Sequence, residues 1–266
     1  MKKFTAIILT FVFYAANAQK TDRDSIKIAN PPAAKSNPLD GFRTIRATKI
    51  KITSLILPAA AIAYGFVSLE NDELKKLNSN TKLEITEDHP RPVTKLDNYL
   101  QYSPAVAVYA LNAFGIKGKN NFRDRTIILG LSTVITTAIT VPLKHITKEQ
   151  RPDGSDFYSF PSGHTATAFA AAEFLRQEYK DVSPWYGVAG YTAAAVTGIL
   201  RLYNNKHWVS DVVAGAGIGI ISTKLTYWIY PSIKRKLFKN KPMNTIIMPF
   251  YQPGGGGIAM VYRFRH

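Results

Sequence analysis

The sequence predicts an all-α fold, a bundle of six helices that are predicted to be transmembrane, followed by a small C-terminal β-hairpin. Three observations lead to this prediction. Apolar stretches of helical length recur along the chain, Lys and Arg cluster in alternate connections between them, and the C-terminal segment changes to an alternating pattern with a glycine run. The six apolar stretches are 50–69, 99–115, 126–143, 164–179, 185–203 and 208–230.

The N-terminus has the three parts of a secretory signal peptide. Met1-Lys2-Lys3 is basic, the run from Phe4 to Ala16 is apolar, and Ala16-Asn17-Ala18 is a small-x-small cleavage site. The apolar run is shorter than the ~20 residues that a membrane span needs. Residues 1–18 are therefore predicted to be a cleaved signal peptide, and a retained membrane anchor is the alternative.

The remainder of the chain divides into three segments. Residues 19–47 are polar and contain Asn30-Pro31-Pro32, which predicts a linker. Residues 48–232 contain the six apolar stretches and form the predicted helical domain. Residues 233–266 are predicted to be a basic segment followed by the hairpin.

The composition limits the function. The chain has 266 residues, a net charge of +16 and no cysteine. Without cysteine it has no disulfide, no thiolate metal site and no cysteine nucleophile. The positive charge favours anionic partners such as nucleic acid, anionic lipid or phosphorylated substrates. Because the signal peptide predicts export, nucleic acid is not a predicted partner.

Two of the apolar stretches give further detail about the bundle. The third is a plausible membrane span, because Thr126 to Leu143 contains no charged residue. The sixth contains Gly215, Gly217 and Gly219. Glycines at these positions would let neighbouring helices approach closely.

The connecting loops alternate in charge. Basic residues precede the first stretch, separate the second from the third and follow the sixth, and the loop Glu70–Asp97 contains seven of the eighteen acidic residues. If the basic loops are cytoplasmic, the acidic loop and the loops after the third and fifth stretches face the other side. The basic residues are Arg43, Arg46, Lys49, Lys51, Lys117, Lys119, Arg123, Arg125, Lys234, Arg235, Lys236, Lys239 and Lys241.

A cleaved signal peptide conflicts with this topology, because it leaves the mature N-terminus outside while six spans with these loops need it inside. Three alternatives stay open. The signal is retained, or the stretch 50–69 does not cross, or the protein is a soluble or surface-attached exported bundle.

The last segment, Asn244 to Phe264, has the pattern of a β-hairpin. Two alternating runs flank Gln252-Pro253 and four glycines, and the second run would place Ile258, Met260, Tyr262 and Phe264 on one face. An outer-membrane strand is the functional alternative, but one hairpin cannot close a barrel. A small sheet beside the bundle is therefore predicted.

Lys144 and Arg151 are the first candidate site residues. They are seven residues apart, so a continuing helix would place both on one face. Pro152 disfavours helix at Arg151 and is predicted to end it there. Two cations at the end of a bundle suit a phosphate, which Arg can bind with two hydrogen bonds. A basic helix end beside the membrane is the structural alternative.

The second candidate segment is Phe160-Pro161-Ser162-Gly163-His164, just before an Ala-rich run. Ser162 is predicted to be an N-cap. The first free amides of that helix, with Gly163 allowing close approach, would form an anion site. His164 would lie in the first turn, where it could pass a proton to a leaving oxygen. The alternative is an ordinary capped helix with a surface histidine.

The third candidate segment is Arg201-x5-His207-x3-Asp211. His207 and Asp211 are four residues apart and would be neighbours on a helix. A carboxylate that accepts from one ring nitrogen fixes the tautomer and leaves the other nitrogen as a base or nucleophile. Arg201 would add a third cation. A surface His–Asp pair is one alternative, and a metal site is disfavoured because zinc needs three or four ligands.

In this order, the three segments resemble the type 2 phosphatidic acid phosphatase superfamily, which is related to vanadium haloperoxidases. Its signature reads Lys-x6-Arg-Pro, Pro-Ser-Gly-His and Ser-Arg-x5-His-x3-Asp. The one departure is Leu200, which stands where the family has Ser and removes a hydroxyl contact. Phe160 and the run His207–Gly215 resemble the membrane lipid phosphatase branch more than the soluble branch.

The resemblance implies a role for each matching residue. His207 would attack phosphorus and become a phosphohistidine, Asp211 would orient it, and His164 would protonate the leaving group and then activate water. The phosphate oxygens would be held by Lys144, Arg151, Ser162, Gly163 and Arg201. No metal ion and no other cofactor is required.

The predicted function is a metal-independent lipid phosphatase of the cell envelope, with residues 48–232 as its phosphatase domain and its site on the extracytoplasmic side. The predicted substrates are lipid phosphates or diphosphates of the isoprenoid diphosphate, lipid A, phosphatidate or phosphatidylglycerol phosphate class. The membrane is the other predicted partner, and the oligomeric state is not predicted. The alternatives are a soluble periplasmic non-specific acid phosphatase, a vanadate haloperoxidase and a non-catalytic phospholipid-binding membrane protein.

Overall fold

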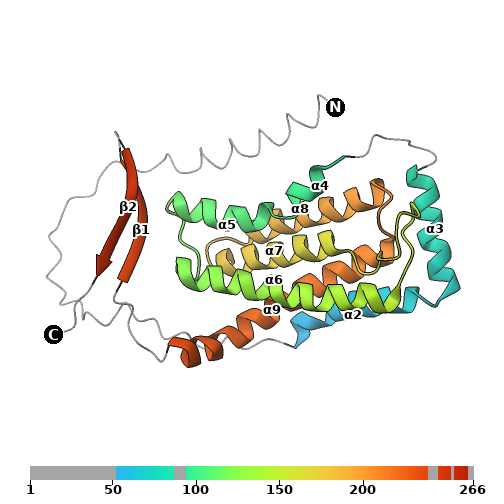
Figure 1. Ribbon diagram of the computed structural model, residues 1–266, viewed down its shortest axis with the longest axis horizontal. Helices are drawn as coiled ribbons and strands as arrows, with labels where there is room; N and C mark the ends of the chain where they lie inside the picture. The colour runs from blue at the N-terminus through green and yellow to red at the C-terminus, as the bar shows by residue number, and fades with distance from the viewer. Residues whose placement is uncertain (1–51, 87–93, 239–244, 253–254, 263–266) are drawn as a thin grey trace. The chain divides into compact units, whose positions relative to one another are not determined.

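The computed structural model describes residues 52–86, 94–238, 245–252 and 255–262 (Figure 1). The predicted signal peptide, 1–18, and linker, 19–47, lie outside these residues. The described residues form eight helices, where the sequence predicts six, and two strands. In chain order these are α2 Thr53–Ser68, α3 Asp72–Thr86, α4 Leu96–Leu100, α5 Ser103–Ala113, α6 Phe122–Thr147, α7 Gly163–Tyr179, α8 Pro184–Tyr203, α9 Val209–Phe238, β1 Thr245–Gln252 and β2 Gly255–Tyr262.

Helix α7 is the centre of the bundle and packs against α5, α6, α8 and α9 (Figure 1). Its N-terminal half is rich in alanine, and small side chains let the neighbouring helices approach closely. Phe174, Leu175 and Tyr179 fill the wider space toward its C-terminal end, where they join the main hydrophobic cluster. The fully or nearly fully buried alanines are Ala166, Ala168, Ala170, Ala171 and Ala172.

Glycines on α9 bring its backbone against two other helices, as the sequence predicts. A Cβ atom on Gly219 would lie 2.8 Å from the backbone nitrogen of Ala170 on α7 and closer still to the carbonyl of Ala166. A Cβ atom on Gly217 would instead collide with the carbonyl of Pro58 on α2. Helix α9 is therefore held between α7 and α2, with no room for side chains at these positions.

Replacing Gly219 with alanine is expected to destabilise the protein by about 1–3 kcal/mol, because backbone atoms must move to admit the methyl group. Gly130, in the middle of α6, is a matched control. A Cβ atom on Gly130 would have no atom outside its own helix within 4 Å, so Gly130→Ala is expected to be neutral or stabilising by up to about 1 kcal/mol. Thermal unfolding of both variants in detergent tests this, and equal shifts would contradict it.

The two additional helices come from segments that the sequence predicts to be a loop or part of a longer helix. Helix α3 lies in the predicted acidic loop, with Asp72 and Glu73 in its first turn, where carboxylates are favourable. The predicted stretch 99–115 is interrupted, and Pro104 is in the first turn of α5. Proline is well tolerated there, so it starts a new helix rather than continuing α4.

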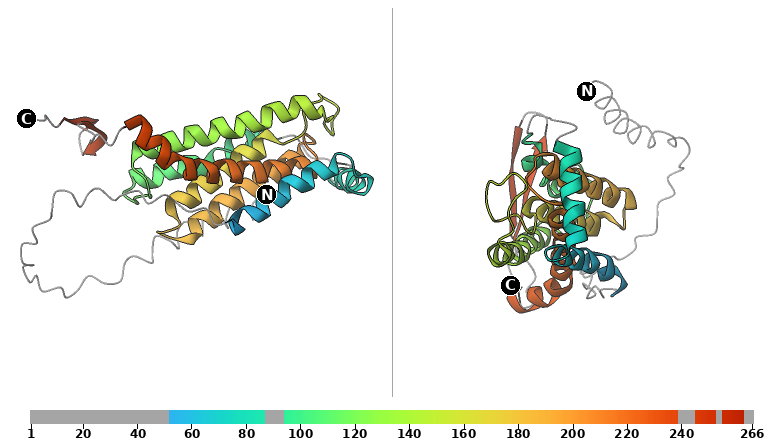
Figure 2. Two further views of the ribbon diagram at one scale, coloured as in Figure 1. Left: turned by 90° about the horizontal axis from the view of Figure 1, so that it is seen from below. Right: turned by 90° about the vertical axis from the view of Figure 1, so that its right-hand side faces the viewer.

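Two helices are long and apolar enough to cross a membrane, α6 and the part of α9 from Val209 to Lys236. Helices α2 and α3 meet at a 94° bend, and counting them as one broken span would give a third. Figure 2 shows α3 crossing the end of the bundle. The described part of the chain thus has two or three candidate spans, fewer than the six predicted, because several helices carry charges or are short.

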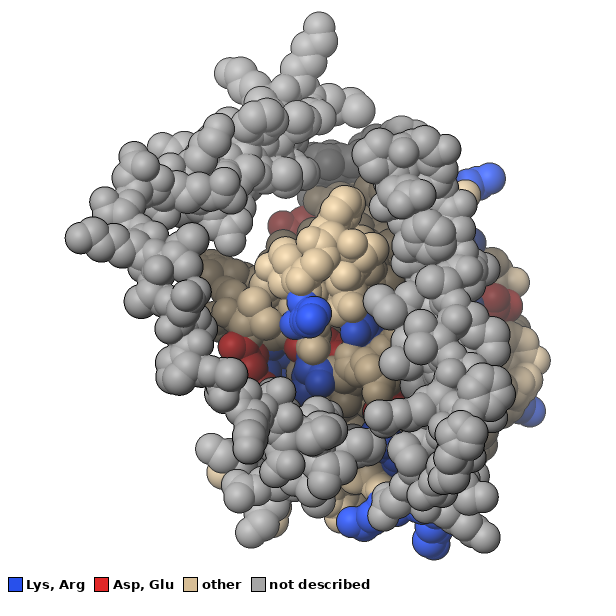
Figure 3. All heavy atoms as spheres, turned by 90° about the vertical axis from the view of Figure 1, so that its left-hand side faces the viewer, with Lys and Arg blue, Asp and Glu red and all other residues tan. Residues whose placement is uncertain are grey.

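The α5–α6 connection marks one end of the bundle, opposite the α6–α7 and α8–α9 connections (Figure 1). Lys and Arg side chains are visible at this end in Figure 3. Asp124 on α6 accepts hydrogen bonds from Tyr230 (2.8 Å) and Lys234 (2.5 Å) on α9. Glu178 accepts from Asn120 and Tyr227. Polar contacts therefore tie the helices together at the end rich in basic residues.

Strands β1 and β2 pair in antiparallel register, Thr245 with Tyr262 and Gln252 with Gly255. They form a two-stranded sheet of their own.

Candidate active site

The predicted site residues come from two connections that lie at the same end of the bundle, α6–α7 and α8–α9 (Figure 1). The backbone N–H of Ser162 donates to the carbonyl of Asp211 at 3.0 Å, which joins the two connections directly. The bundle thus brings together segments that are about 50 residues apart in sequence.

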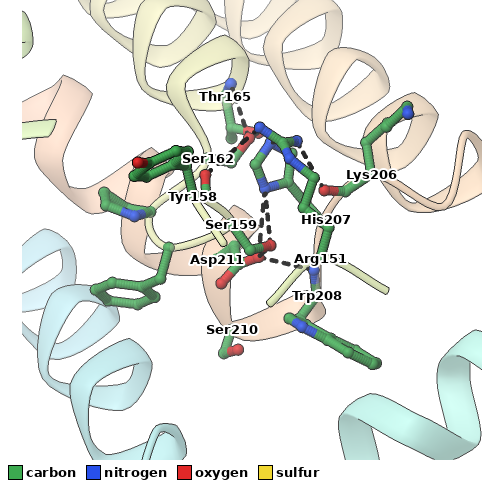
Figure 4. A network of polar contacts seen from close by, with 12 residues as sticks. Arg151, Tyr158, Ser159, Ser162, Thr165, Lys206, His207, Trp208, Ser210 and Asp211 are labelled. Carbon is green, nitrogen blue, oxygen red and sulfur yellow. Dashed lines mark hydrogen bonds and ion pairs between the residues drawn. The ribbon is translucent and has the colours of Figure 1, made fainter. Parts of the chain in front are cut away.

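His207 lies in the α8–α9 connection and is 4% exposed. Its Nε2 is 3.2 Å from Nη1 of Arg151, and its Nδ1 is 3.3 Å from Oδ2 of Asp211 (Figure 4). Arginine can only donate, so Nε2 accepts and the ring hydrogen is on Nδ1, from which it is shared with the carboxylate. His207 therefore presents its Nε2 lone pair to the cationic side of the site.

Asp211 is completely buried in the first turn of α9. Besides His207, its Oδ2 accepts a hydrogen bond from the backbone N–H of Trp208 at 2.9 Å and from Oγ of Ser159 at 2.5 Å (Figure 4). Ser159 is also buried, and its Oγ lies 3.4 Å from Nδ1 of His207. The carboxylate is thus held in one orientation by three donors.

The α6–α7 connection differs from the prediction at its start. Helix α6 ends at Thr147, and Lys148 has left-handed backbone angles (φ 48°), so Arg151 is in a loop rather than on the helical face of Lys144. The end of the helix precedes Pro152 by several residues. Arg151 reaches the site from this loop, where its Nε is paired with Asp156 at 2.7 Å. Its Nη1 also donates to the carbonyl of Lys206 at 3.0 Å.

Lys144 supports the loop that carries the second motif. Its Nζ donates to the carbonyls of Tyr158 (2.7 Å), Ser159 (3.2 Å) and Pro161 (2.7 Å). The side chain of Lys144 therefore lies against the loop that leads to Gly163. A Cβ atom added to Gly163 would be 3.9 Å from Cε of Lys144.

Ser162 caps α7, as the sequence predicts. Its Oγ accepts from the backbone N–H of Thr165 at 3.4 Å and from Oγ1 of Thr165 at 2.9 Å. Gly163 and His164 follow as the first two residues of α7. The N-terminus of a long helix, with its partial positive charge, therefore points into the same region as His207.

A short helix that sequence reasoning missed completes the site. Asp97 on α4 is paired with Arg201 at 2.6 Å, and Oδ1 of Asn98 is 2.8 Å from Nε2 of His164. Asp97 is buried, whereas Asn98 is exposed at the rim. No motif of the sequence points to either residue. Ser159 is also missed, because it lies outside the three motif segments.

The electrostatic setting keeps both imidazoles neutral. Burial, together with the charges of Lys144, Arg201 and Arg151, holds the pKa of His207 well below its usual value. Burial and then the charge of Arg201 lower the pKa of His164 to about 4. A neutral His207 retains the lone pair that a nucleophile or base needs. The surplus of cations around two neutral rings makes the site a receptor for an anion.

Comparisons with known proteins give a consistent picture. Residues 125–235 match the PAP2 superfamily model. A lipid A 1-phosphatase from Porphyromonas gingivalis is 43% identical over 143 residues, which are 53% of this chain and 32% of that protein. The lipid phosphate phosphatase gamma of Arabidopsis thaliana is 26% identical over 171 residues, 58% of this chain and 75% of that protein.

Among solved structures, the chain is similar to the first transmembrane PAP2 type phosphatidylglycerolphosphate phosphatase from Bacillus subtilis. The TM-score is 0.48 at 18% identity, covering 70% of this chain and 99% of that one. The chain spans about a third of the length of the Porphyromonas relative.

Proposed function

The chain belongs to the PAP2 superfamily through residues 125–235, and on that basis we propose that it is a metal-independent phosphatase that removes a terminal phosphate from a lipid phosphate or diphosphate. The observation that carries the proposal is the arrangement around His207. One ring nitrogen is held by a buried carboxylate and the other faces Arg151. This is the arrangement that a nitrogen nucleophile requires.

In the first step, Nε2 of His207 forms a bond to phosphorus while the bond from phosphorus to the leaving oxygen breaks. The negative charge of the bound phosphate favours the protonated form of His164, which then supplies the proton that the leaving oxygen takes up. The hydrogen on Nδ1 of His207 stays shared with Asp211, which stabilises the positive charge that develops on the ring. The product of this step is a phosphohistidine.

In the second step, His164 accepts a proton from water as the water oxygen attacks phosphorus. The bond between phosphorus and Nε2 breaks, inorganic phosphate leaves and His207 returns to its neutral form. His164 gives a proton in the first step and regains one in the second, and His207 is released unchanged. Both histidines are therefore ready for another reaction cycle.

The cations have a defined part in both steps. Arg151 occupies the position in front of Nε2, and a phosphoryl group entering there would meet its guanidinium. Within the described part of the chain, the buried Nε of Arg201 has no hydrogen-bond partner, and a phosphate oxygen would supply one. Ser162 and Gly163 complete the phosphate-binding residues, and Lys144, whose Nζ donates to three carbonyls, attracts the phosphate through its charge. Donors already in place stabilise the charge of the transition state without reorganisation.

The lipid character of the substrate rests on the membrane helices and on the relatives. Helices α6 and α9 can each cross a membrane, so the site lies at the end of candidate spans. The 43% identity to a lipid A 1-phosphatase makes lipid A the first class to assay. The segregation of basic loops to the opposite end supports an extracytoplasmic site.

Phosphate release from a panel of substrates tests the proposal. We expect the purified protein in detergent to release phosphate from at least one of lipid A, an isoprenoid diphosphate, phosphatidate or phosphatidylglycerol phosphate. We expect that rate to exceed the rate with a soluble phosphomonoester and to be unchanged by a chelator. Release from the soluble ester alone would favour a non-specific acid phosphatase, and loss of activity on chelation would contradict the metal-free reaction.

A further inference from the structure

Helix α4 reaches the site through Asn98, which contacts the second histidine. Oδ1 of Asn98 lies 2.8 Å from Nε2 of His164, on the adjacent central helix α7. An amide oxygen can only accept, so the ring hydrogen of a neutral His164 is on Nε2 and the lone pair is on Nδ1. The same hydrogen bond persists when the ring is protonated.

Helix α4 is anchored at two points that precede this contact. Before it, the side chain of Asn204 accepts from the backbone N–H of Thr94 at 3.1 Å and donates to its carbonyl at 2.9 Å. One residue before Asn98, the buried Asp97 is paired with Arg201 at 2.6 Å. Asn204 and Arg201 are both at the end of α8. A helix of five residues is thereby fixed to the bundle, with Asn98 directed at His164.

We propose that Asn98 is a positioning residue that fixes the ring of His164, so that its transferable proton is always on Nδ1. This inference rests on the proposed phosphatase function and adds a residue that no motif contains. The other two site groups already have fixed partners: Asp211 holds His207, and Asp97 holds Arg201. Asn98 gives His164 the equivalent constraint.

The constraint has a direct chemical consequence. With Nε2 committed to Asn98, protonation of His164 occurs on Nδ1, and Nδ1–H is the bond that breaks when the leaving oxygen takes its proton. In the second step the proton from water returns to Nδ1. A carboxylate partner would stabilise the protonated ring and so oppose release of its proton. The amide of Asn98 is uncharged, so it holds the ring without this effect.

The charged groups that face His164 determine how a substitution of Asn98 would change the pKa of His164. They come from four elements: Arg201 on α8, Asp97 on α4, Arg151 in the α6–α7 connection and Lys144 on α6. Three of the four are cationic, and with burial they lower the pKa of His164 to about 4. A carboxylate in place of the Asn98 amide would raise that pKa, and a bound phosphate would raise it in every variant.

The test compares the pH dependence of kcat for the wild type, Asn98→Ala and Asn98→Asp. His164 acts as an acid only when protonated, so kcat falls as the pH rises through its pKa in the enzyme–substrate complex. We expect Asn98→Asp to move this decline about one pH unit or more toward alkaline pH. We expect Asn98→Ala to lower kcat about tenfold or more with little change in KM, because the ring of His164 is then no longer held with its Nδ1 proton directed at the leaving oxygen. Tyr99→Phe, an exposed neighbour on α4, is the control and should match the wild type.

The outcomes separate this inference from the function on which it rests. If wild type is active, His207→Ala is inactive and Asn98→Asp leaves the pH profile unmoved, Asn98 has no positioning role and the phosphatase proposal stands. If the wild type releases no phosphate from any lipid, the phosphatase proposal fails first. Thermal unfolding identifies a purely structural effect. If Asn98→Ala lowers kcat only in proportion to lost folded protein, and Asn98→Asp does not restore kcat at its shifted optimum, the inference is overturned.

Discussion

His207→Ala is expected to lower kcat for phosphate release by at least about 10⁴-fold, because it removes the atom that attacks phosphorus. The side chain is buried, and both its ring nitrogens are already engaged by Asp211 and Arg151. No other imidazole among the described residues contacts these two partners. The measurement is single-turnover release of phosphate from a lipid phosphate, with the variant checked for unchanged thermal unfolding.

His145→Ala is the matched control, since His145 is exposed on α6 and packs against the ring of Tyr158. It should retain nearly full activity. Rapid quenching of the wild type with a radiolabelled substrate should also trap an acid-labile phosphoprotein, and His207→Ala should give none. Equal phosphate release from wild type and His207→Ala would remove His207 as the nucleophile.

Asp211→Asn is expected to lower kcat by about 10²–10⁴-fold with a small effect on KM. The amide is nearly the same size as the carboxylate, but it carries no charge to stabilise the ring once the phosphorus bond forms. The amide oxygen of Asn can still accept from Ser159, Trp208 and His207, as Oδ2 of Asp211 does, so the lost charge is the main change. Steady-state kinetics on the lipid substrate measures the effect.

Asp153→Asn provides the comparison for Asp211→Asn. Asp153 is an exposed carboxylate of the α6–α7 loop that pairs with Lys206, the residue next to His207. Losing this ion pair should change activity less than about threefold, since exposed pairs contribute little. If both variants lose activity to the same extent, loop disruption rather than the charge of Asp211 would explain the loss.

The parts of the site that were predictable from sequence depend on local signals. A serine before an Ala-rich run indicates an N-cap, and Ser162 caps α7. A spacing of four residues suggests that His207 and Asp211 are neighbours, and they are, although His207 precedes α9 rather than lying on it. Lys144 and Arg151 would share one helical face only if the helix continued to Arg151, and it does not, because α6 ends at Thr147.

The missed parts depend on contacts between residues far apart in the chain. Asp97 and Asn98 lie in a helix of five residues, which is too short for a periodic pattern. Their partners, Arg201 and His164, are 104 and 66 positions away. Ser159 belongs to a loop whose shape depends on three carbonyl contacts from Lys144. Such contacts become visible only when the helices are packed.

The close backbone approach of α9 to α7 has a mechanical consequence. A side chain on Gly215 would strike the carbonyl of Ser162, and Ser162 itself bonds to the carbonyl of Asp211. The turn that precedes His164 is therefore clamped to the turn that follows His207. Tilting or sliding of the two helices, as a thicker or thinner bilayer would impose, must be taken up at their far ends. We therefore expect the spacing between the two imidazoles to change little with the thickness of the membrane.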